Sequence, residues 1–340
     1  MDPPSVDAAR FYAEYHGHPL DQLDALHAAL APGADVTVFL TGDSSLDNKH
    51  WFFSESSPKE EQLTQGAEAQ GSDLPNFLAP AVNGYETLLK PSRMVKDVAY
   101  FVNFLAPSIM GARTVCFNAA VEESTIRDRM EAGSGLLPHD EWVRGRLGRG
   151  GTHDVVVLSV GGNDVALRPT LATSASLFAL TRLPMPLLRF FGRWAPGFGH
   201  MQRLFHGEVE AMVQRLITPP LPGDVSSLSG TSGFRTGSGD QELEQRRIGA
   251  PAFRPPALVN ADPARLQFLL TLLYHAISQK GFQSSGFTTV LPFPLFEVLD
   301  GKESGDYLQR VEPSVEGGRK IAGALLEFIA RQRCPVHDPH

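Results

Sequence analysis

Residues 36 to 48 have the sequence Val36-Thr37-Val38-Phe39-Leu40-Thr41-Gly42-Asp43-Ser44-Ser45-Leu46-Asp47-Asn48. A short apolar run that stops at a glycine is typical of a buried parallel strand followed by a tight turn. Ligands bind at this carboxyl end of the strands in open α/β sheets. A serine placed there, beside the free N–H groups of a following helix, is a candidate nucleophile. The alternative is that Ser44 and Ser45 cap that helix and that Asp43 is a turn residue.

Residues 154 to 164 repeat this pattern. Their sequence is Asp154-Val155-Val156-Val157-Leu158-Ser159-Val160-Gly161-Gly162-Asn163-Asp164. An apolar strand again ends at glycine and is followed at once by polar residues. Two parallel strands that end in this way would direct the Ser44 hydroxyl and the Asn163 carboxamide into one crevice. The carboxamide can donate a hydrogen bond to an oxyanion, as acyl transfer requires.

The two blocks together resemble those of the GDSL or SGNH hydrolase superfamily. Residues 42–46 match its first block, and residues 161–164 match its Gly-x-Asn-Asp block. The resemblance covers roughly residues 34 to 330. It implies an α/β fold of three layers, α/β/α, with a flavodoxin-like parallel sheet of about four to five strands.

The same resemblance implies a serine esterase or lipase-like acyl hydrolase. It would cleave a carboxylic ester, either of a small molecule or of a lipid-like substrate, through an acyl-Ser44 intermediate, without a cofactor. Asn163 and the Ser44 backbone N–H would stabilise the oxyanion. The residues expected to support this site are Asp43, Gly162, Asp164 and Ala120.

One departure from the superfamily pattern lies after a second expected strand, Arg113–Phe117. The superfamily has a glycine there whose backbone N–H joins the oxyanion hole. This chain has none at that place, and Glu122 or Glu123 lies near it. A backbone N–H survives the substitution, but a carboxylate would repel an oxyanion unless it points away or is protonated. The alternative role of these glutamates is to stabilise a helix N-terminus.

The second departure concerns the base. In the frame of residues 309–318, Glu312 stands where the superfamily has its catalytic His, and Gln309 stands where it has Asp. A serine hydroxyl is a poor nucleophile until a base removes its proton. Glu312 can serve as that base if desolvation raises its pKa toward neutrality. The imidazoles that offer an alternative are His200, His206 and His275.

Composition limits the other classes. Apolar residues make up 42% of the 340 residues and charged residues 20%, which is ordinary for a globular enzyme. The net charge of −8 excludes a strong basic field for nucleic acid. The two cysteines are too few for a disulfide framework, and Cys116 lies in a strand-like run that predicts a buried thiol. The first residues show no signal peptide, so we expect a cytoplasmic protein.

A single domain is expected over residues 1–335, interrupted twice. Residues 168–216 are rich in Leu, Phe and Met and predict inserted helices, either packed on the domain or forming a lid over an acyl pocket. Arg182 and the prolines beside it break this run, so no transmembrane segment is expected. Residues 219–256 are of low complexity and predict a flexible loop. The last strand is expected at Phe287–Leu291, before a closing helix at Gly317–Arg331.

Other kinds of site have less support. No dinucleotide or P-loop glycine pattern is present. His16 and His18 have no third ligand nearby, and a hard-cation site built from Asp43, Asp47, Asp164 and Glu312 is conceivable but not expected. Two alternatives to the esterase stay open: a binding protein with a degraded hydrolase site, and an acyl or glycan transferase that uses the same crevice.

Overall fold

The computed structural model describes residues 5–53, 59–64, 75–130, 135–148, 153–218, 263–280, 293, 298–299, 305–308 and 312–333. Three elements of the sequence analysis lie outside these residues: the strand expected at 287–291, the low-complexity segment 219–256, and Gln309.

Within the described residues, the central sheet contains three of the four to five strands that were expected. They are β2 (Val36–Gly42), β6 (Thr114–Asn118) and β7 (His153–Ser159). All are parallel, in the order β6-β2-β7, so the first strand along the chain lies in the middle. The strand order reverses beside β2, and ligands bind at such a point in open α/β sheets. The chain is therefore a mixed α/β protein with a parallel sheet.

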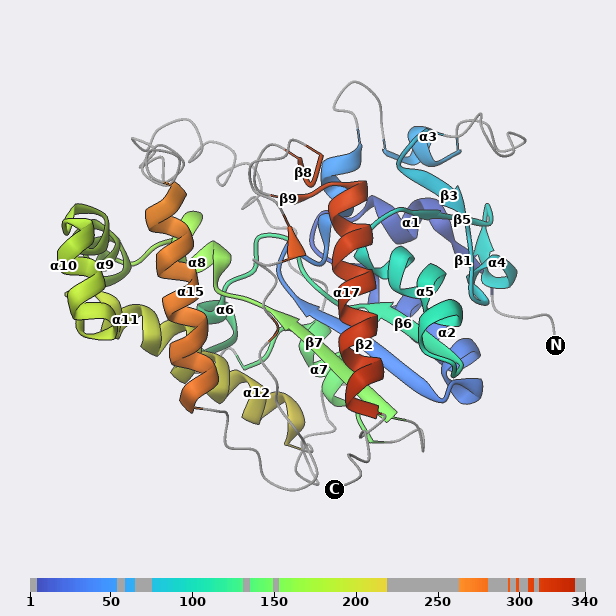
Figure 1. Ribbon diagram of the computed structural model, residues 1–340. Helices are drawn as coiled ribbons and strands as arrows, with labels where there is room; N and C mark the ends of the chain where they lie inside the picture. Colours follow the sequence, from blue (N-terminus) through green and yellow to red (C-terminus); the bar gives the residue numbers. More distant parts are fainter. Residues whose placement is uncertain are drawn as a thin grey trace.

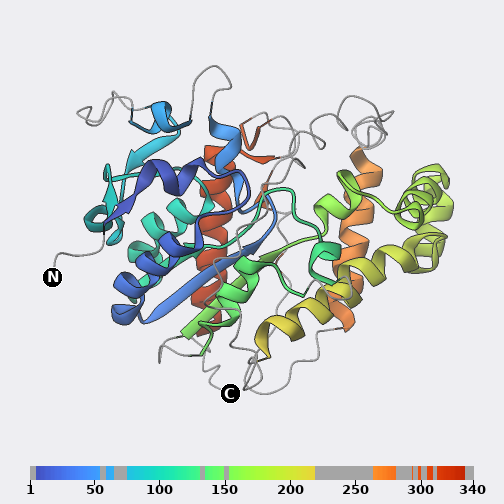
Figure 2. The ribbon, with the colours of Figure 1, turned by 180° about the vertical axis from the view of Figure 1, so that it is seen from behind.

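Helices cover both faces of this sheet (Figures 1 and 2). On one face lie α2 (Leu20–Leu30) and α7 (Pro138–Arg144), where His27 and Trp142 contact the rings of Phe39 and Phe117.

On the other face lie α5 (Val98–Ile109) and α17 (Val315–Arg333), which pack on each other. Asn103 of α5 donates to the Cys116 carbonyl at 3.0 Å, and the Cys116 thiol is free and buried, as predicted. Apolar side chains of the sheet are thus buried on both sides, which explains why the strands are near-continuous apolar runs.

Short elements surround this core. The strand β1 (Val6–Asp7) pairs parallel with β4 (Leu89–Lys90). Antiparallel pairs are formed by β3 (Leu78–Pro80) with β5 (Arg93–Val95), and by β8 (Tyr307–Leu308) with β9 (Glu312–Pro313). The short helices here are α1 (Ala8–Ala13), η1 (Ala31–Gly33), η2 (Asn48–Phe52), α3 (Lys59–Thr64), α4 (Tyr85–Leu88) and α6 (Ile126–Met130).

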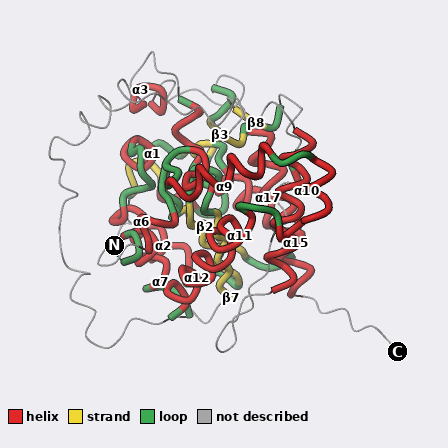
Figure 3. The backbone as a smooth tube through the Cα atoms, turned by 90° about the vertical axis from the view of Figure 1, so that its left-hand side faces the viewer, coloured by secondary structure: helices red, strands yellow, loops and turns green. Residues whose placement is uncertain are grey.

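The predicted insertion follows β7 and is entirely helical. Its helices are α8 (Gly162–Ala166), α9 (Leu171–Arg182), α10 (Met185–Phe191), η4 (Gly192–Trp194), α11 (Phe198–Gln202), η5 (Arg203–Glu208) and α12 (Val209–Ile217). With α15 (Pro263–Lys280) they bury a small core of their own around Leu180, Leu188 and Phe198. Viewed from this side, α9, α11 and α12 lie in front of the sheet (Figure 3). None of the described helices is by itself long and apolar enough to cross a membrane.

Candidate active site

The turn that carries Ser44 depends on Gly42. This glycine ends β2 with φ of 126°, and a Cβ at this position would lie 1.9 Å from the Ser159 carbonyl oxygen. Asp43 N–H donates to that same oxygen at 2.8 Å. The ends of β2 and β7 therefore approach so closely that only glycine fits. The α-helix expected directly after Ser44 is instead a turn followed by the short 3-10 helix η2.

Ser44 and Glu312 meet at this edge of the sheet. The Ser44 hydroxyl donates to Glu312 Oε1 at 2.8 Å, and each residue is only 6% exposed. This pairing was expected from the resemblance although 268 positions separate the two residues. A hydroxyl that donates to a carboxylate at this distance has the geometry for proton transfer to a base.

The loop after Ser44 also positions Glu312. Asn48 Nδ2, at the start of η2, donates to the Pro313 carbonyl at 2.8 Å. Glu312 itself lies in β9, which pairs with β8 and is extended by a bond from Ser314 N–H to the Asp306 carbonyl at 3.0 Å. One short segment thus holds both the hydroxyl and the strand that carries the carboxylate.

Burial changes the acidity of Glu312. Desolvation raises its pKa to about 7, the Ser44 hydroxyl opposes this, and the nearby carboxylates of Asp43 and Asp47 raise it further. The sequence analysis required such a shift for a carboxylate base. At neutral pH a substantial fraction of Glu312 is ionised and able to accept a proton.

The loop after β6 contains a second buried acid, Glu122. Its side chain accepts a bond from Trp51 Nε1 at 3.3 Å, and the residue is 2% exposed. Burial, followed by the charges of Glu312 and Asp47, raises its pKa to about 9. Glu122 is therefore protonated at neutral pH and does not repel an oxyanion. Its neighbour Glu123 has φ of 58°, the left-handed conformation that glycine adopts most readily.

A buried ion pair beneath this loop was missed by the sequence analysis. Lys49 Nζ lies 2.6 and 2.8 Å from the two oxygens of Asp47, and both side chains are fully buried. Asp47 Oδ2 also accepts from the N–H groups of Gly17 and Glu122 at 3.0 and 3.3 Å. The one sequence feature that could have indicated this pair is the position of Lys49, two residues before the aromatic run that begins at Trp51. Such a lysine is more often solvated, so the pattern alone did not predict the pair.

The candidate oxyanion donors are unequally available. The Ala120 N–H donates to Asn118 Oδ1 at 3.1 Å and is thus already used within its loop. Asn163 Nδ2 donates to the Ser124 carbonyl at 3.0 Å, but an amide nitrogen carries two hydrogens, so one remains. The Ser44 N–H donates to no residue within the described part of the chain. Ser44 and Asn163 themselves are not hydrogen-bonded to each other.

The other predicted support residues, Asp43, Gly162 and Asp164, connect the turns that follow β2 and β7. The Asp43 carboxylate accepts from Ser45 N–H and Oγ at 3.2 and 2.7 Å, and burial raises its pKa. A Cβ at Gly162 would lie 3.6 Å from Asp43 Oδ2, so the two strand-end turns are adjacent. Asp164 accepts from the Ile126 N–H at 2.8 Å and joins the insertion to α6. These roles are structural.

The candidate imidazoles are occupied elsewhere. His200 Nε2 forms a 3.0 Å hydrogen bond with Thr173 Oγ1 in the insertion, and His16 Nδ1 lies 3.1 Å from the Glu122 carbonyl. Within the described residues, the Ser44 hydroxyl has Glu312 as its partner and contacts neither His206 nor His275. Glu312 is therefore the only base that the described structure offers to Ser44.

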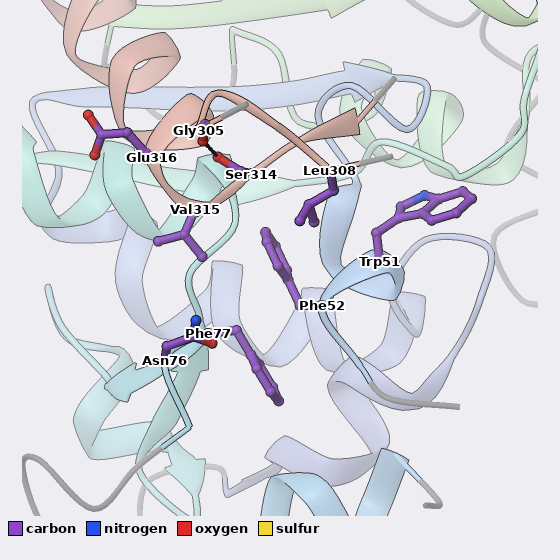
Figure 4. Close-up of a pocket in the computed structure, with 9 residues that line it drawn as sticks. All are labelled: Trp51, Phe52, Asn76, Phe77, Gly305, Leu308, Ser314, Val315 and Glu316. Carbon is purple, nitrogen blue, oxygen red and sulfur yellow. Dashed lines mark hydrogen bonds between the residues drawn. The ribbon is translucent and has the colours of Figure 1, made fainter. Parts of the chain in front are cut away.

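A cavity of about 340 Å³ is lined by residues of η2 and of the segments that flank β9, and neither Ser44 nor Glu312 is in its lining. Phe52, Leu308 and Val315 point into a common space, and the Ser314 hydroxyl donates to the Gly305 carbonyl at its rim (Figure 4). The full lining is Trp51, Phe52, Asn76, Phe77, Gly305, Leu308, Ser314, Val315 and Glu316. Leu308 of this lining is paired with Glu312 in the β8–β9 ladder, and Phe52 lies in η2 with Asn48, so the cavity borders the segments that hold Glu312.

Within the described ranges, no group of three or more His, Cys, Asp or Glu side chains is arranged to hold a metal ion. Comparisons of this chain with protein-family models, with curated proteins and with solved structures give no match. Its function is therefore inferred from the geometry of the site.

Proposed function

We propose that this chain is a serine esterase with an SGNH hydrolase-like arrangement, in which Ser44 is the nucleophile and Glu312 the general base. The observation that carries this proposal is the 2.8 Å hydrogen bond from the Ser44 hydroxyl to Glu312 Oε1, between two residues that are each 6% exposed. The pKa of Glu312, raised to about 7 by burial, matches a base that works near neutral pH.

The reaction divides into two steps. Ser44 Oγ attacks the carbonyl carbon of the ester while its proton passes to Glu312. The tetrahedral intermediate then expels the alcohol, which takes that proton, and leaves an acyl-Ser44 ester. Water attacks the acyl group with Glu312 again as the base, and the breakdown of the second intermediate returns the proton to Ser44 and releases the acid.

Two donors are proposed for the oxyanion: the Ser44 N–H and the second hydrogen of Asn163 Nδ2. Glu122, protonated near neutral pH, keeps negative charge away from the same loop. The substrate is proposed to be a small or lipid-like ester whose apolar part enters the cavity lined by Phe52, Phe77 and Leu308.

The test is hydrolysis of short- and medium-chain p-nitrophenyl esters from pH 5 to 9. Wild type is expected to show kcat/KM that rises with a midpoint near pH 7, because Glu312 must be ionised. Ser44→Ala and Glu312→Gln are each expected to lose about 10³-fold or more in kcat. Labelling with a fluorophosphonate should add one phosphonyl group to wild type and none to Ser44→Ala.

Ser45→Ala is the matched control, since Ser45 lies beside the nucleophile but bonds to Asp43 rather than Glu312. It should keep most of the activity and the label. Equal background rates in all variants, with no labelling of Ser44, would reject the esterase.

A ligand-binding protein with a degraded hydrolase site is the second candidate. The observations in its favour are the lack of an imidazole beside Ser44 and the use of the Ala120 N–H within its own loop. It predicts that ester analogues bind equally to wild type and to Glu312→Gln without turnover.

A further inference from the structure

The insertion exposes a band of large apolar side chains at one end of the molecule. Phe190 is 82% exposed and Trp194 77%. In α10 and η4 the exposed residues recur at the spacing of one helical side, and α9 adds two more. The full set is Leu171, Phe178, Leu187, Phe190, Phe191 and Trp194. This many exposed large apolar residues on adjoining helices marks an interaction surface rather than ordinary scatter.

The charge of this segment differs from that of the rest of the chain. From Val165 to Gly207 there is no Asp, Glu or Lys, while the chain as a whole has a net charge of −8. The segment carries five arginines: Arg168, Arg182, Arg189, Arg193 and Arg203. Arg168 forms an ion pair with Asp128 outside the segment, so the other four arginines give it a formal charge of +4. A cationic and apolar surface on an acidic protein is complementary to an anionic and apolar partner.

The arginines lie among the exposed rings. The Arg182 guanidinium is 5.2 Å from the ring centroid of Phe178, and that of Arg193 is 5.2 Å from the ring centroid of Trp194. Aromatic rings with cationic groups beside them are typical of the interface between lipid headgroups and acyl chains.

The shape of the segment favours a position on a bilayer over one across it. The helices Leu171–Arg182 and Met185–Trp194 are bent by 114° relative to each other, and neither alone is long enough to span. Beneath them, Leu180, Leu188 and Phe198 hold the segment on its own small core. Figures 1 and 2 both show α9 and α10 at the end of the molecule opposite α4.

We propose that α9, α10 and η4 form a docking surface for an anionic lipid bilayer. Phe190 and Trp194 would enter the boundary between headgroups and acyl chains, and Arg182, Arg189 and Arg193 would contact anionic headgroups. This inference does not rest on the proposed esterase activity, because vesicle binding and ester hydrolysis are measured separately.

The test is co-sedimentation of the full chain with vesicles of phosphatidylcholine alone or with about 30% phosphatidylglycerol. Binding to the anionic vesicles should be at least about ten-fold tighter and should weaken with added salt. The variant Phe190→Ser with Trp194→Ser should lose at least about ten-fold in affinity. The variant Arg182→Gln, Arg189→Gln, Arg193→Gln should bind both kinds of vesicle alike.

Phe104→Ser is the matched control, because Phe104 is 53% exposed but lies on α5. It should bind as wild type does. Trp194→Phe should still bind the vesicles but should not show the blue shift of tryptophan fluorescence that wild type shows on binding. This loss would identify Trp194 as the inserted ring. Circular dichroism melts of each variant separate lost binding from lost folding.

Three outcomes would overturn the proposal. The first is a folded wild type that binds neither vesicle. The second is binding that Phe104→Ser weakens as much as the double variant does. The third is self-association that the double variant abolishes without any vesicle binding, which would assign the surface to a second copy of this chain.

Discussion

A carboxylate that replaces an imidazole as a base needs help from its surroundings. An unperturbed Glu has a pKa of about 4.3 and is too weak a base to take a proton from a serine hydroxyl efficiently. At Glu312, burial supplies most of the increase, and the negative charges of Asp43 and Asp47 add to it. The basicity of Glu312 is therefore a property of the whole strand-end cluster.

This origin predicts the effect of Asp43→Asn. Removal of one neighbouring negative charge should lower the pKa of Glu312, so the midpoint of the kcat/KM profile should shift down by about 0.5–1 pH unit. The measurement is the pH–rate profile of the variant on a p-nitrophenyl ester. Ser45→Ala removes the hydroxyl that bonds to Asp43 but leaves its charge, so its midpoint should stay in place. A midpoint unchanged in Asp43→Asn would mean that Glu312 does not set the profile.

A residue of the site could be predicted where the sequence immediately around it indicates its position. Ser44, Asp43 and Asn163 directly follow apolar strands, so pattern alone placed them at the sheet edge. Glu312 was found only through the resemblance, because nothing in its own neighbourhood points to a residue so far away in the chain. Glu122 was noted as a departure, but its raised pKa depends on burial and on the charges of Glu312 and Asp47, which a sequence does not display.

At the scale of elements, the end of β2 decides where the site can form. Gly42 combines φ of 126° with a Ser159 carbonyl that leaves no room for a Cβ. The carbonyl of Gly42 also accepts from Arg129, which is buried and bonded to Asp140 at 2.7 Å. The turn that carries Ser44 is thus held by backbone from β7 on one side and by a buried ion pair on the other.

We predict that Gly42→Ala destabilises the fold by more than about 3 kcal/mol, since strain and clash act together. Equilibrium urea unfolding measures this. Gly111→Ala is the control, because Gly111 has φ of 60° but open space where the Cβ would lie. It should cost only about 1–2 kcal/mol, the strain alone. Equal losses of unfolding free energy in the two variants would show that the close approach of Gly42 to Ser159 does not add to the cost of the substitution.

Elements with a strong period were predicted well. The three strands of the sheet and the helix α17 lie within a few residues of their expected positions, because each is a clear apolar run or a clear 3.6-residue repeat. The insertion was predicted as helical, either packed on the domain or forming a lid over an acyl pocket. The sequence did not predict that Phe190 and Trp194 are exposed, since apolar content indicates that a segment is covered but does not identify what covers it.

Within the described part of the molecule, the buried acids outnumber the ion pairs that contain a buried acid. Burial raises the pKa of Asp97 and of Glu312 to about 7 and that of Glu122 to about 9. In the unfolded chain these groups ionise near pH 4. Because the folded pKa values are the higher ones, the unfolded state loses its protons first as pH rises. The stability that these three protonated carboxyl groups contribute is fully present below about pH 4 and is lost as pH rises through 7 to 9.

We therefore predict that Glu122→Gln, which keeps an acceptor for Trp51 but cannot ionise, flattens this dependence. At pH 8.5 the variant should be more stable than wild type by on the order of a few kcal/mol, while at pH 4.5 the two should be nearly equal. Thermal melts across this range measure it. Glu14→Gln, which changes an exposed carboxylate, should follow the wild-type curve at every pH. A wild type whose stability rises from pH 5 to 9, or a Glu122→Gln variant with the same slope, would mean that Glu122 is ionised in the folded protein. The proposed site would then carry a negative charge beside its oxyanion.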